Sequence, residues 1–178
     1  SGMRAAMFAH DMLLAGSHDV LVAGGMESMT NAPHLLLKGR SGIRIGHDRV
    51  MDHMMLDGLE DAYEAGRSMG TFGEDCAAKY GFTREQQDNF ATASVQRAQA
   101  AIKSGAFAAE ITPVTIKTRT GEEQITVDEG PGKIKLEKIP ALKPAFKKDG
   151  TITAASSSSI NDGAAAMVMM RALSLIHI

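Results

Sequence analysis

An α/β fold is predicted by three features of the sequence, which has 178 residues. Residues 2–15 have the composition of an apolar helix that is closed by Gly16. The run at residues 19–23, which is apolar after Asp19, then has the length of a buried strand. A capping box at residues 83–86 opens a second, longer helix. A helix that leads into a fully apolar strand is typical of layered α/β proteins, so we expect helices packed on a sheet.

The first helix and the strand after it are both expected in the core. Ala, Met, Leu and Phe cover the helix on nearly all sides, which predicts that most of its faces are buried. The strand at residues 19–23 suits a parallel sheet that is covered on both faces. Gly24 and Gly25 then lead the chain out of the strand, and they let the backbone come close either to a neighbouring element or to a ligand.

Between this strand and the capping box, the chain is expected to make an excursion and then return to helix. Residues 38–50 are punctuated by glycine and alternate as a hairpin does, whereas residues 51–65 are amphipathic and predicted to be partly helical. His34, His47 and His53 lie here without the spacing or the cysteine partners of a metal site. We therefore interpret them as ordinary surface or core histidines.

The helix predicted at residues 71–80 carries the single cysteine, Cys76. Asp75 beside it disfavours the thiolate, and no histidine lies nearby in sequence, so we interpret Cys76 as structural rather than nucleophilic. The charges of the longer helix that follows are interpreted as a solvated face. After that helix, residues 109–117 predict a strand and residues 118–132 a polar surface loop.

A lysine run and a serine-rich turn come next, and they are the candidate binding features. The lysines are Lys133, Lys135, Lys138, Lys143, Lys147 and Lys148. A charge run is usually a solvated face, but this one leads into four serines at residues 156–159 and an expected turn at residues 161–163. Hydroxyl groups on a tight turn between two buried elements suit a ligand site, to which the lysines would attract a phosphate. A plain serine-rich turn is the alternative.

Composition narrows the classes of function. The net charge of −2 gives no field that would attract nucleic acid or a membrane surface, and no apolar run is long enough to span a bilayer. A single cysteine excludes an internal disulfide framework and fits a reducing compartment, so we expect a cytoplasmic protein. The chain begins at Ser1 and ends in the uncapped apolar residues 173–178, so we expect a piece of a longer protein.

Seven segments, in this order and at near-family spacing, together resemble the thiolase family. They are Ser1-Gly2-Met3, residues 22–29, Ala32-Pro33-His34, Asp57-Gly58-Leu59, Met69-Gly70, residues 142–146 and residues 153–166. Each segment alone is a weak signal, but the combination covers most of the chain and is specific to the family. It is most similar to the short-chain members, which interconvert two acetyl-CoA with acetoacetyl-CoA and free coenzyme A.

The resemblance implies a fold and a domain organisation. We expect part of the layered αβαβα thiolase fold, in which residues 1–30 and 160–172 belong to the N-terminal core domain. Residues 31–159 would form an inserted loop domain that holds coenzyme A, and residues 173–178 fit no part of the family. Residues 34–50 resemble a hairpin through which family members form homotetramers.

The resemblance places no catalytic residue within this chain. Ser1-Gly2-Met3 matches the second half of the family's Cys-x-Ser-Gly-Met motif, so the nucleophilic cysteine is expected two residues before Ser1. The family's histidine and second cysteine are expected beyond residue 178. A Claisen condensation needs a thiolate to hold the acyl group and a base to remove a proton, so the chain alone is expected to be inactive.

What the resemblance does place here is substrate binding. The positions that correspond to residues along the path of coenzyme A are Leu59, Tyr63, Met69, Lys133, Lys138, Phe146, Ala154 and Ser158. A weaker likeness to a potassium-binding subgroup involves Tyr63, Ala154, Ala155 and Ser157. Acyl-CoA thioesters are the expected substrates, and no covalently bound cofactor is expected. Ser68 stands where the family often has histidine, which shifts the contacts to coenzyme A. Ser156 stands where the family has asparagine, so the geometry of the serine turn stays open.

Two other functions remain open at this stage. One is a degradative 3-ketoacyl-CoA thiolase that takes longer acyl chains by the same chemistry. The other is a thiolase-like protein without catalysis that binds acyl-CoA or serves as a structural partner. The residue two positions before Ser1 separates catalysis from binding, because a thiolase without its cysteine cannot form the acyl-enzyme.

Overall fold

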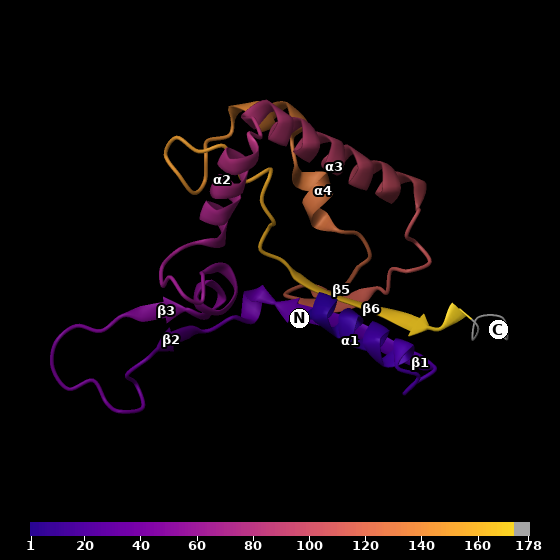
Figure 1. Cartoon of the computed structure of the whole chain (residues 1–178), viewed down its shortest axis with the longest axis horizontal. Coiled ribbons are helices and arrows are strands. Elements are labelled where there is room, and N and C mark those ends of the chain that lie inside the picture. The colour runs from indigo at the N-terminus through magenta and orange to yellow at the C-terminus, as the bar shows by residue number, and fades with distance from the viewer. Residues whose placement is uncertain (173–178) are drawn as a thin grey trace. The chain divides into compact units, whose positions relative to one another are not determined.

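The computed structural model describes residues 1–172 (Figure 1). Within it the chain divides into two compact units. Residues 1–58 and 160–172 form the first unit, and residues 59–159 form the second. The domain boundaries expected from the family stay predictions, and the expected tail at residues 173–178 lies outside the described residues.

A two-stranded antiparallel sheet is the frame of the first unit. β1 (Val20–Ser28) pairs with β6 (Asp162–Met170) along its whole length, from Val20 opposite Met170 to Ser28 opposite Asp162. α1 (Gly2–Leu14) packs on β1, and Figure 1 shows the helix running alongside the strand. The predicted parallel pairing is wrong for these two strands. The chain enters β6 at the end where it leaves β1, which makes them antiparallel.

Gly24 and Gly25 lie inside β1 rather than after it. A Cβ on Gly24 would stand 2.3 Å from the carbonyl oxygen of Ala165 on β6, and a Cβ on Gly25 would stand 2.9 Å from Cα of Gly2 on α1. The strand can lie this close to both neighbours only because these two residues have no side chain. Of the two interpretations that the sequence allowed, the structure therefore shows close approach to neighbouring elements.

The first unit buries few apolar side chains. Ala9 and Leu13 are the buried residues of α1, whereas Met3 is 82% exposed. On β1, Ala23 is buried but Val22 is 71% exposed, and most of β6 is exposed as well. The predictions that the helix is buried on most faces and that the strand at residues 19–23 is covered on both faces are therefore wrong for the described residues. One helix and two strands can cover only one face of each other.

Asp162 ties the beginning of β6 to the segment that follows β1. One of its carboxylate oxygens accepts a hydrogen bond from the N–H of Thr30, at 2.9 Å, in the short helix η1 (Met29–Asn31). This bond from the Thr30 backbone lowers the pKa of Asp162. Asp162 and Gly163 are therefore the first residues of a strand, rather than the turn that the sequence predicts.

The predicted excursion between residues 38 and 50 is confirmed as a hairpin. β2 (His34–Leu36) pairs antiparallel with β3 (Val50–Asp52), and the loop between them carries Ile45 with 98% of its surface exposed. The predicted helical part of residues 51–65 is a single π-helical turn, η2 (Met55–Leu59).

The second unit is built on two capped helices. α2 (Met69–Tyr80) begins where the hydroxyl of Ser68 accepts a hydrogen bond from the Gly70 N–H. α3 (Arg84–Ser104) begins at the predicted capping box, in which the side chains of Thr83 and Gln86 bond each other's backbone N–H groups. Among residues 1–172, no helix combines the length and the apolar character that crossing a bilayer requires.

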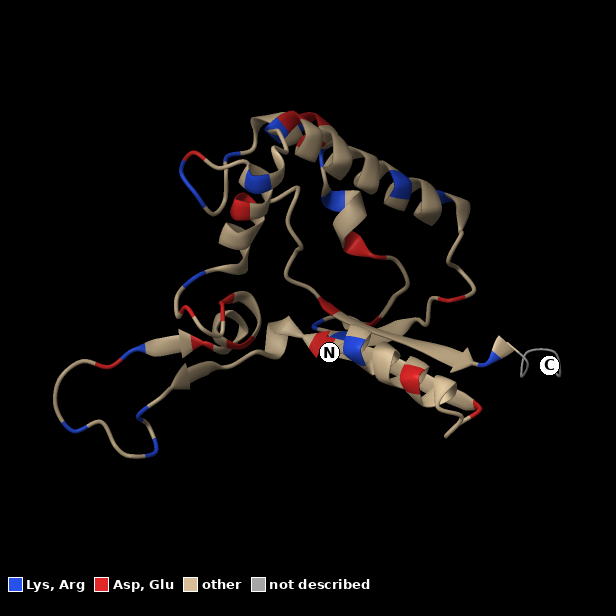
Figure 2. Cartoon of the chain, in the orientation of Figure 1, with Lys and Arg blue, Asp and Glu red and all other residues tan. Residues whose placement is uncertain are grey.

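The segment after α3 holds more regular structure than the sequence predicts. Its elements are β4 (Val114–Thr118), β5 (Gly121–Ile125), α4 (Glu129–Lys133) and η3 (Leu136–Ala141). The strand predicted at residues 109–117 begins five residues later, and the loop predicted at residues 118–132 contains the antiparallel partner of β4 and the short helix α4. Figure 2 shows the opposite charges at the two ends of α4.

The core of the second unit forms where α2 and α3 meet η3 and the chain that follows it. Ile139 and Thr153 are its most deeply buried residues, at 1% and 0% exposure, and Ala91 and Val95 are buried on α3. The prediction that the charges of α3 form a solvated face is wrong for Asp88, which is only 8% exposed. Its carboxylate accepts hydrogen bonds from Nε of Arg84, at 2.8 and 2.9 Å, which offset the cost of burial.

Candidate functional site

The candidate site is the segment of residues 139–158, which we call the binding segment. It carries three of the residues predicted to contact coenzyme A, namely Phe146, Ala154 and Ser158. After η3 ends at Ala141 it contains no helix or strand. Its backbone groups therefore need partners from other elements, and these partners determine its shape.

A buried carboxylate on α2 holds the middle of the binding segment. Glu74 is only 7% exposed. Its Oε1 accepts hydrogen bonds from the N–H groups of Ile152, at 2.9 Å, and Thr151, at 3.1 Å. Its Oε2 accepts from the N–H of Thr151, at 2.9 Å, and from the hydroxyl of Thr151, at 3.3 Å. A Cβ on Gly150 would stand 2.2 Å from Oε1, so a residue without a side chain precedes the two donors.

The environment of Glu74 keeps its carboxyl group charged. Burial raises its pKa, but the backbone hydrogen bonds from Thr151 and Ile152, the Thr151 hydroxyl and the charge of Lys147 together lower the pKa below its ordinary value. A lowered pKa means that the charged form stabilises the fold above the ordinary value, and that this stabilisation is lost as the pH falls through the lowered value. The carboxylate is therefore fully present at neutral pH.

A guanidinium group on α3 holds the beginning of the binding segment. Nη2 of Arg84 donates hydrogen bonds to the carbonyl oxygens of Leu142, at 2.8 Å, Ile139, at 3.2 Å, and Pro140, at 3.4 Å. Arginine suits this task because it presents several donors in a fixed plane. Backbone N–H groups thus meet a carboxylate from α2, and backbone carbonyls meet a guanidinium from α3.

Thr151 is held from both helices. Its hydroxyl oxygen accepts a hydrogen bond from Nε2 of Gln87 on α3, at 2.9 Å, while its N–H bonds Glu74 on α2. A single threonine thus joins the two helices to the binding segment, and the position of the next residues depends on both.

Phe146 rests on the first turn of α2. A Cβ on Gly70 would stand only 2.3 Å from two atoms of the Phe146 ring, so the ring occupies the space that a side chain at Gly70 would fill. Phe146 is 38% exposed, and Met69, the residue before Gly70, is 40% exposed. The N–H of Ala145 donates to the carbonyl oxygen of Ile152, at 2.8 Å. This bond joins the two arms of the binding segment, residues 139–146 and residues 151–158, beside the ring.

The serine turn is organised around the buried Thr153. The hydroxyls of Ser156 and Ser157 donate to the carbonyl oxygen of Thr153, at 3.3 and 2.7 Å, and the Ser156 hydroxyl accepts from the N–H of Thr153, at 3.0 Å. Ser156, which departs from the family, therefore bonds two backbone groups of one residue. Ser158 is exposed, and its hydroxyl bonds no other group among residues 1–172. Of these three serines, Ser158 is the one available to a ligand.

The other predicted contacts lie outside this segment or at its beginning. Leu59 is half-buried at the end of η2, and Tyr63 is 96% exposed in the loop before α2. Lys133, at the end of α4, forms an ion pair with Glu129. Lys138 lies exposed on η3, beside the residue that Arg84 holds, and forms no ion pair within the part of the chain that the structure describes.

The roles assigned to these residues stay predictions, and so does the potassium site. Ala154, Ala155 and Ser157 all lie on the serine turn, but the hydroxyl of Ser157 donates to the carbonyl oxygen of Thr153. No group of three or more His, Cys, Asp and Glu side chains that could hold a metal ion occurs among the described residues. Cys76, which the sequence predicts to be structural, is exposed on α2.

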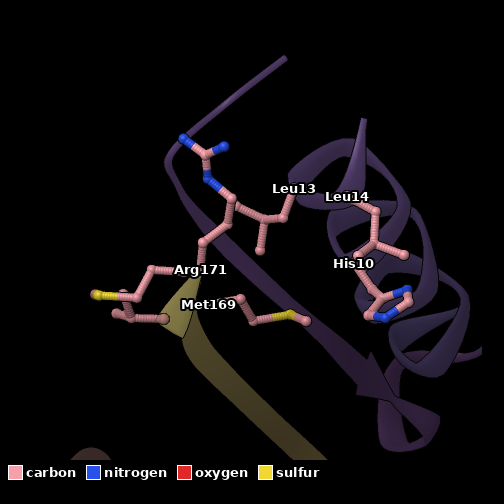
Figure 3. Close-up of a pocket in the computed structure, with 7 residues that line it drawn as sticks. His10, Leu13, Leu14, Met169 and Arg171 are labelled. Carbon is pink, nitrogen blue, oxygen red and sulfur yellow. The ribbon is translucent and has the colours of Figure 1, made fainter. Parts of the chain in front are cut away.

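A separate apolar pocket of about 380 Å³ lies in the first unit, between α1 and the end of β6 (Figure 3). His10, Leu13, Leu14, Val168, Met169, Met170 and Arg171 line it. None of the residues predicted to bind coenzyme A is among them, and the guanidinium of Arg171 forms an ion pair with Asp19. The pocket therefore offers a small apolar surface without a charge aimed into it.

The fold and the order of elements define the class of protein. The structure matches that of an acetyl-CoA acetyltransferase from Syntrophomonas wolfei with a TM-score of 0.86 and 44% identity, over 99% of this chain and 44% of that one. An acetyl-CoA acetyltransferase from Bacillus anthracis gives the same TM-score at 38% identity. Residues 1–173 match the model of the thiolase N-terminal domain. The chain belongs to the thiolase family, which confirms the resemblance and the predicted fold class.

The curated relatives point the same way and are longer. The chain is 47% identical over 173 residues to acetyl-CoA acetyltransferase 2 of Arabidopsis thaliana, and the match covers 96% of this chain and 43% of the relative. It is 44% identical over 172 residues to a probable acetyl-CoA acyltransferase of Staphylococcus aureus, which covers 96% and 44% of the two chains. The chain thus spans less than half the length of the curated relatives it matches.

Sequence reasoning missed the residues that hold the binding segment. Glu74 could have been found, because it shares one face of α2 with the small residues Gly70 and Ala77, at helical spacing. Asp88 likewise lies on the face of α3 that carries Ala91 and Val95. An acid on an otherwise small or apolar face of a helix is a signal for a buried, hydrogen-bonded carboxylate.

We predict that Gly70→Ala displaces the Phe146 ring and destabilises the protein by about 1–3 kcal/mol, because the new Cβ would overlap the ring. Gly73→Ala on the same helix is the matched control. Its Cβ would meet Ile152 at an ordinary 3.6 Å, so the gain in helix propensity should stabilise the protein by about 0.5–1 kcal/mol. Urea unfolding measures the change in the free energy of unfolding for both variants. Equal effects of the two substitutions would contradict the position of the Phe146 ring against Gly70.

Proposed function

We propose that this chain is the substrate-holding part of a thiolase that interconverts two acetyl-CoA with acetoacetyl-CoA and free coenzyme A. The observation that carries the proposal is the match of residues 1–173 to the thiolase N-terminal domain, together with relatives named acetyl-CoA acetyltransferase. The reaction is a Claisen condensation through an acyl-cysteine enzyme. Its cysteines and histidine belong to the parts of the longer protein that precede and follow this chain.

The binding segment supplies the thioester's non-reacting contacts in this proposal. The half-exposed faces of Met69 and Phe146 suit the apolar parts of the pantetheine arm, and Leu59, Tyr63 and Ala154 extend this contact. The free hydroxyl of Ser158 suits an amide group of the same arm, and lysines suit the phosphates. Coenzyme A thioesters act as substrates and not as covalently bound cofactors.

The enzyme is proposed to work in the cytoplasm on a small-molecule substrate, with neither nucleic acid nor a membrane as a partner. The small net charge of −2 supports the absence of a polyanionic partner, and the lone cysteine suits a reducing compartment. Figure 2 shows acidic as well as basic residues on the elements of both units, in keeping with this balance.

We predict that the full-length protein carrying this chain cleaves acetoacetyl-CoA with free coenzyme A, and that the 178-residue chain alone does so no faster than a denatured control. The loss of acetoacetyl-CoA and the gain of acetyl-CoA measure the reaction. Activity confined to longer 3-ketoacyl-CoA substrates would replace this proposal with the degradative enzyme. Acyl-CoA binding without turnover of any thioester would leave a non-catalytic binding protein instead.

We predict that Lys138→Ala raises the KM for acetoacetyl-CoA several-fold at low ionic strength and leaves kcat nearly unchanged, because an exposed charge attracts the phosphates without touching the reacting atoms. Lys133→Ala should have a smaller effect, since Glu129 already pairs with this ammonium group. High salt should remove both effects. Lys103→Ala, on the exposed end of α3, is the control. If a pantetheine thioester without the nucleotide shows the same losses, the lysines do not bind phosphate.

We propose a homotetramer that is formed through the hairpin at residues 34–50. Ile45 is 98% and Ile43 46% exposed on its loop, which is costly for apolar side chains unless another subunit covers them. The double substitution Ile43→Asp and Ile45→Asp should therefore dissociate the full-length protein, as measured by sedimentation. Asp48→Ala in the same loop should not. A tetramer that survives the double substitution would show that this hairpin does not hold the subunits together.

A further inference from the structure

We propose that Glu74 is a positioning residue for acyl-CoA, which fixes the two arms of the binding segment in the geometry that the thioester needs. The proposal rests on the proposed function, and it assigns a role to a residue that does not face the ligand. Glu74 lies inside α2, 93% buried, with both carboxylate oxygens directed at the backbone of Thr151 and Ile152.

Glu74 can act on both arms because it bonds Ile152, which is hydrogen-bonded to the first arm and belongs to the second. Glu74 bonds the N–H of Ile152, and the carbonyl oxygen of Ile152 accepts from the N–H of Ala145, at 2.8 Å. Ala145 directly precedes Phe146, so the carboxylate restrains the position of the aromatic ring through Ile152 and Ala145. On the other side, Ile152 directly precedes Thr153, around which the serine turn is built.

No other side chain in the described residues bonds these two backbone N–H groups. Gln87 reaches Thr151 through the threonine hydroxyl, and Arg84 acts on the carbonyl groups of residues 139, 140 and 142. Removing the charge on Glu74 therefore leaves the helices and the Arg84 contacts in place and loosens the middle of the segment. Phe146 and Ser158 would then sample several positions, and a thioester bound between them would lose orientation.

A carboxylate is required here rather than an amide. Its two oxygens accept from three donors, two N–H groups and one hydroxyl. Glutamine at this position has nearly the same shape, but its NH₂ group would face the N–H of Thr151 or of Ile152, and two donors repel. Glu74→Gln therefore changes the hydrogen bonding of the segment with little change in packing.

The experiment uses the full-length protein, with Glu74→Gln and a matched control, Asp75→Asn. Asp75 is the next residue on α2, carries the same charge and bonds Arg67, outside the binding segment. Glu74→Gln should raise the KM for acetoacetyl-CoA about tenfold, because hydrogen bonds to a charged group are lost. The same rise should appear with the pantetheine thioester and should persist at high salt, unlike the effect of the lysines. Asp75→Asn should change neither KM.

A second variant moves the carboxylate without removing it. Gly150→Ala would place a Cβ 2.2 Å from Oε1 of Glu74, whereas Gly132→Ala meets nothing within 4 Å. Gly150→Ala should reproduce the rise in KM on both substrates, and Gly132→Ala should not. This pair decides the question if Glu74→Gln does not fold. Active-site titration of the acylated cysteine counts the folded enzyme molecules. It therefore distinguishes a loss of folded enzyme from a rise in KM.

The outcomes separate this inference from the proposed function. A Glu74→Gln enzyme with unchanged KM, or with fewer active sites of normal KM, would show that Glu74 is only structural and would overturn the inference. A normal KM for Gly150→Ala would overturn it as well. A wild-type protein that cleaves no thioester would instead overturn the proposed function. In that case, the dissociation constant of coenzyme A, measured by calorimetry, still tests Glu74, and equal values for wild type and Glu74→Gln would overturn the inference.

Discussion

The hydrogen bonds between the buried Glu74 carboxylate and the backbone of Thr151 and Ile152 are the constraint on which the binding segment depends. A carboxylate that leaves water must find several donors, and an irregular backbone must find acceptors for its N–H groups. Each need is met by the other. The glycine at residue 150 allows the approach, so sequence and geometry agree at this point.

The same logic, with the charges reversed, holds the beginning of the segment. Arg84 donates to backbone carbonyls and is itself paired with the buried Asp88. In the first unit, Gly24 and Gly25 let α1, β1 and β6 lie in contact. Asp162 bonds Thr30. The segment of the first unit that leads toward the second unit is therefore joined to the segment that returns from it.

The sequence predicts the features that depend on neighbours along the chain. The capping box at Thr83, the apolar helix, the hairpin excursion and the thiolase family are all confirmed. The pairing of β1 with β6 could not be predicted, because more than a hundred residues separate the strands and only the return of the chain sets their direction. The burial of Asp88 was missed for a different reason. A charged residue on a helix is normally solvated, although its partner Arg84 lies only four residues earlier on the same helix.

Glu74 stays charged in its buried position because its carboxylate binds the backbone of the binding segment. An NMR titration of the Glu74 carboxyl carbon and of the Thr151 and Ile152 amide protons tests it most directly. A pKa lowered by these hydrogen bonds predicts one shared midpoint below the ordinary value for glutamate, with the two amide signals moving together as the carboxylate is protonated. A midpoint at or above the ordinary value, with amide signals that do not follow it, would contradict the account.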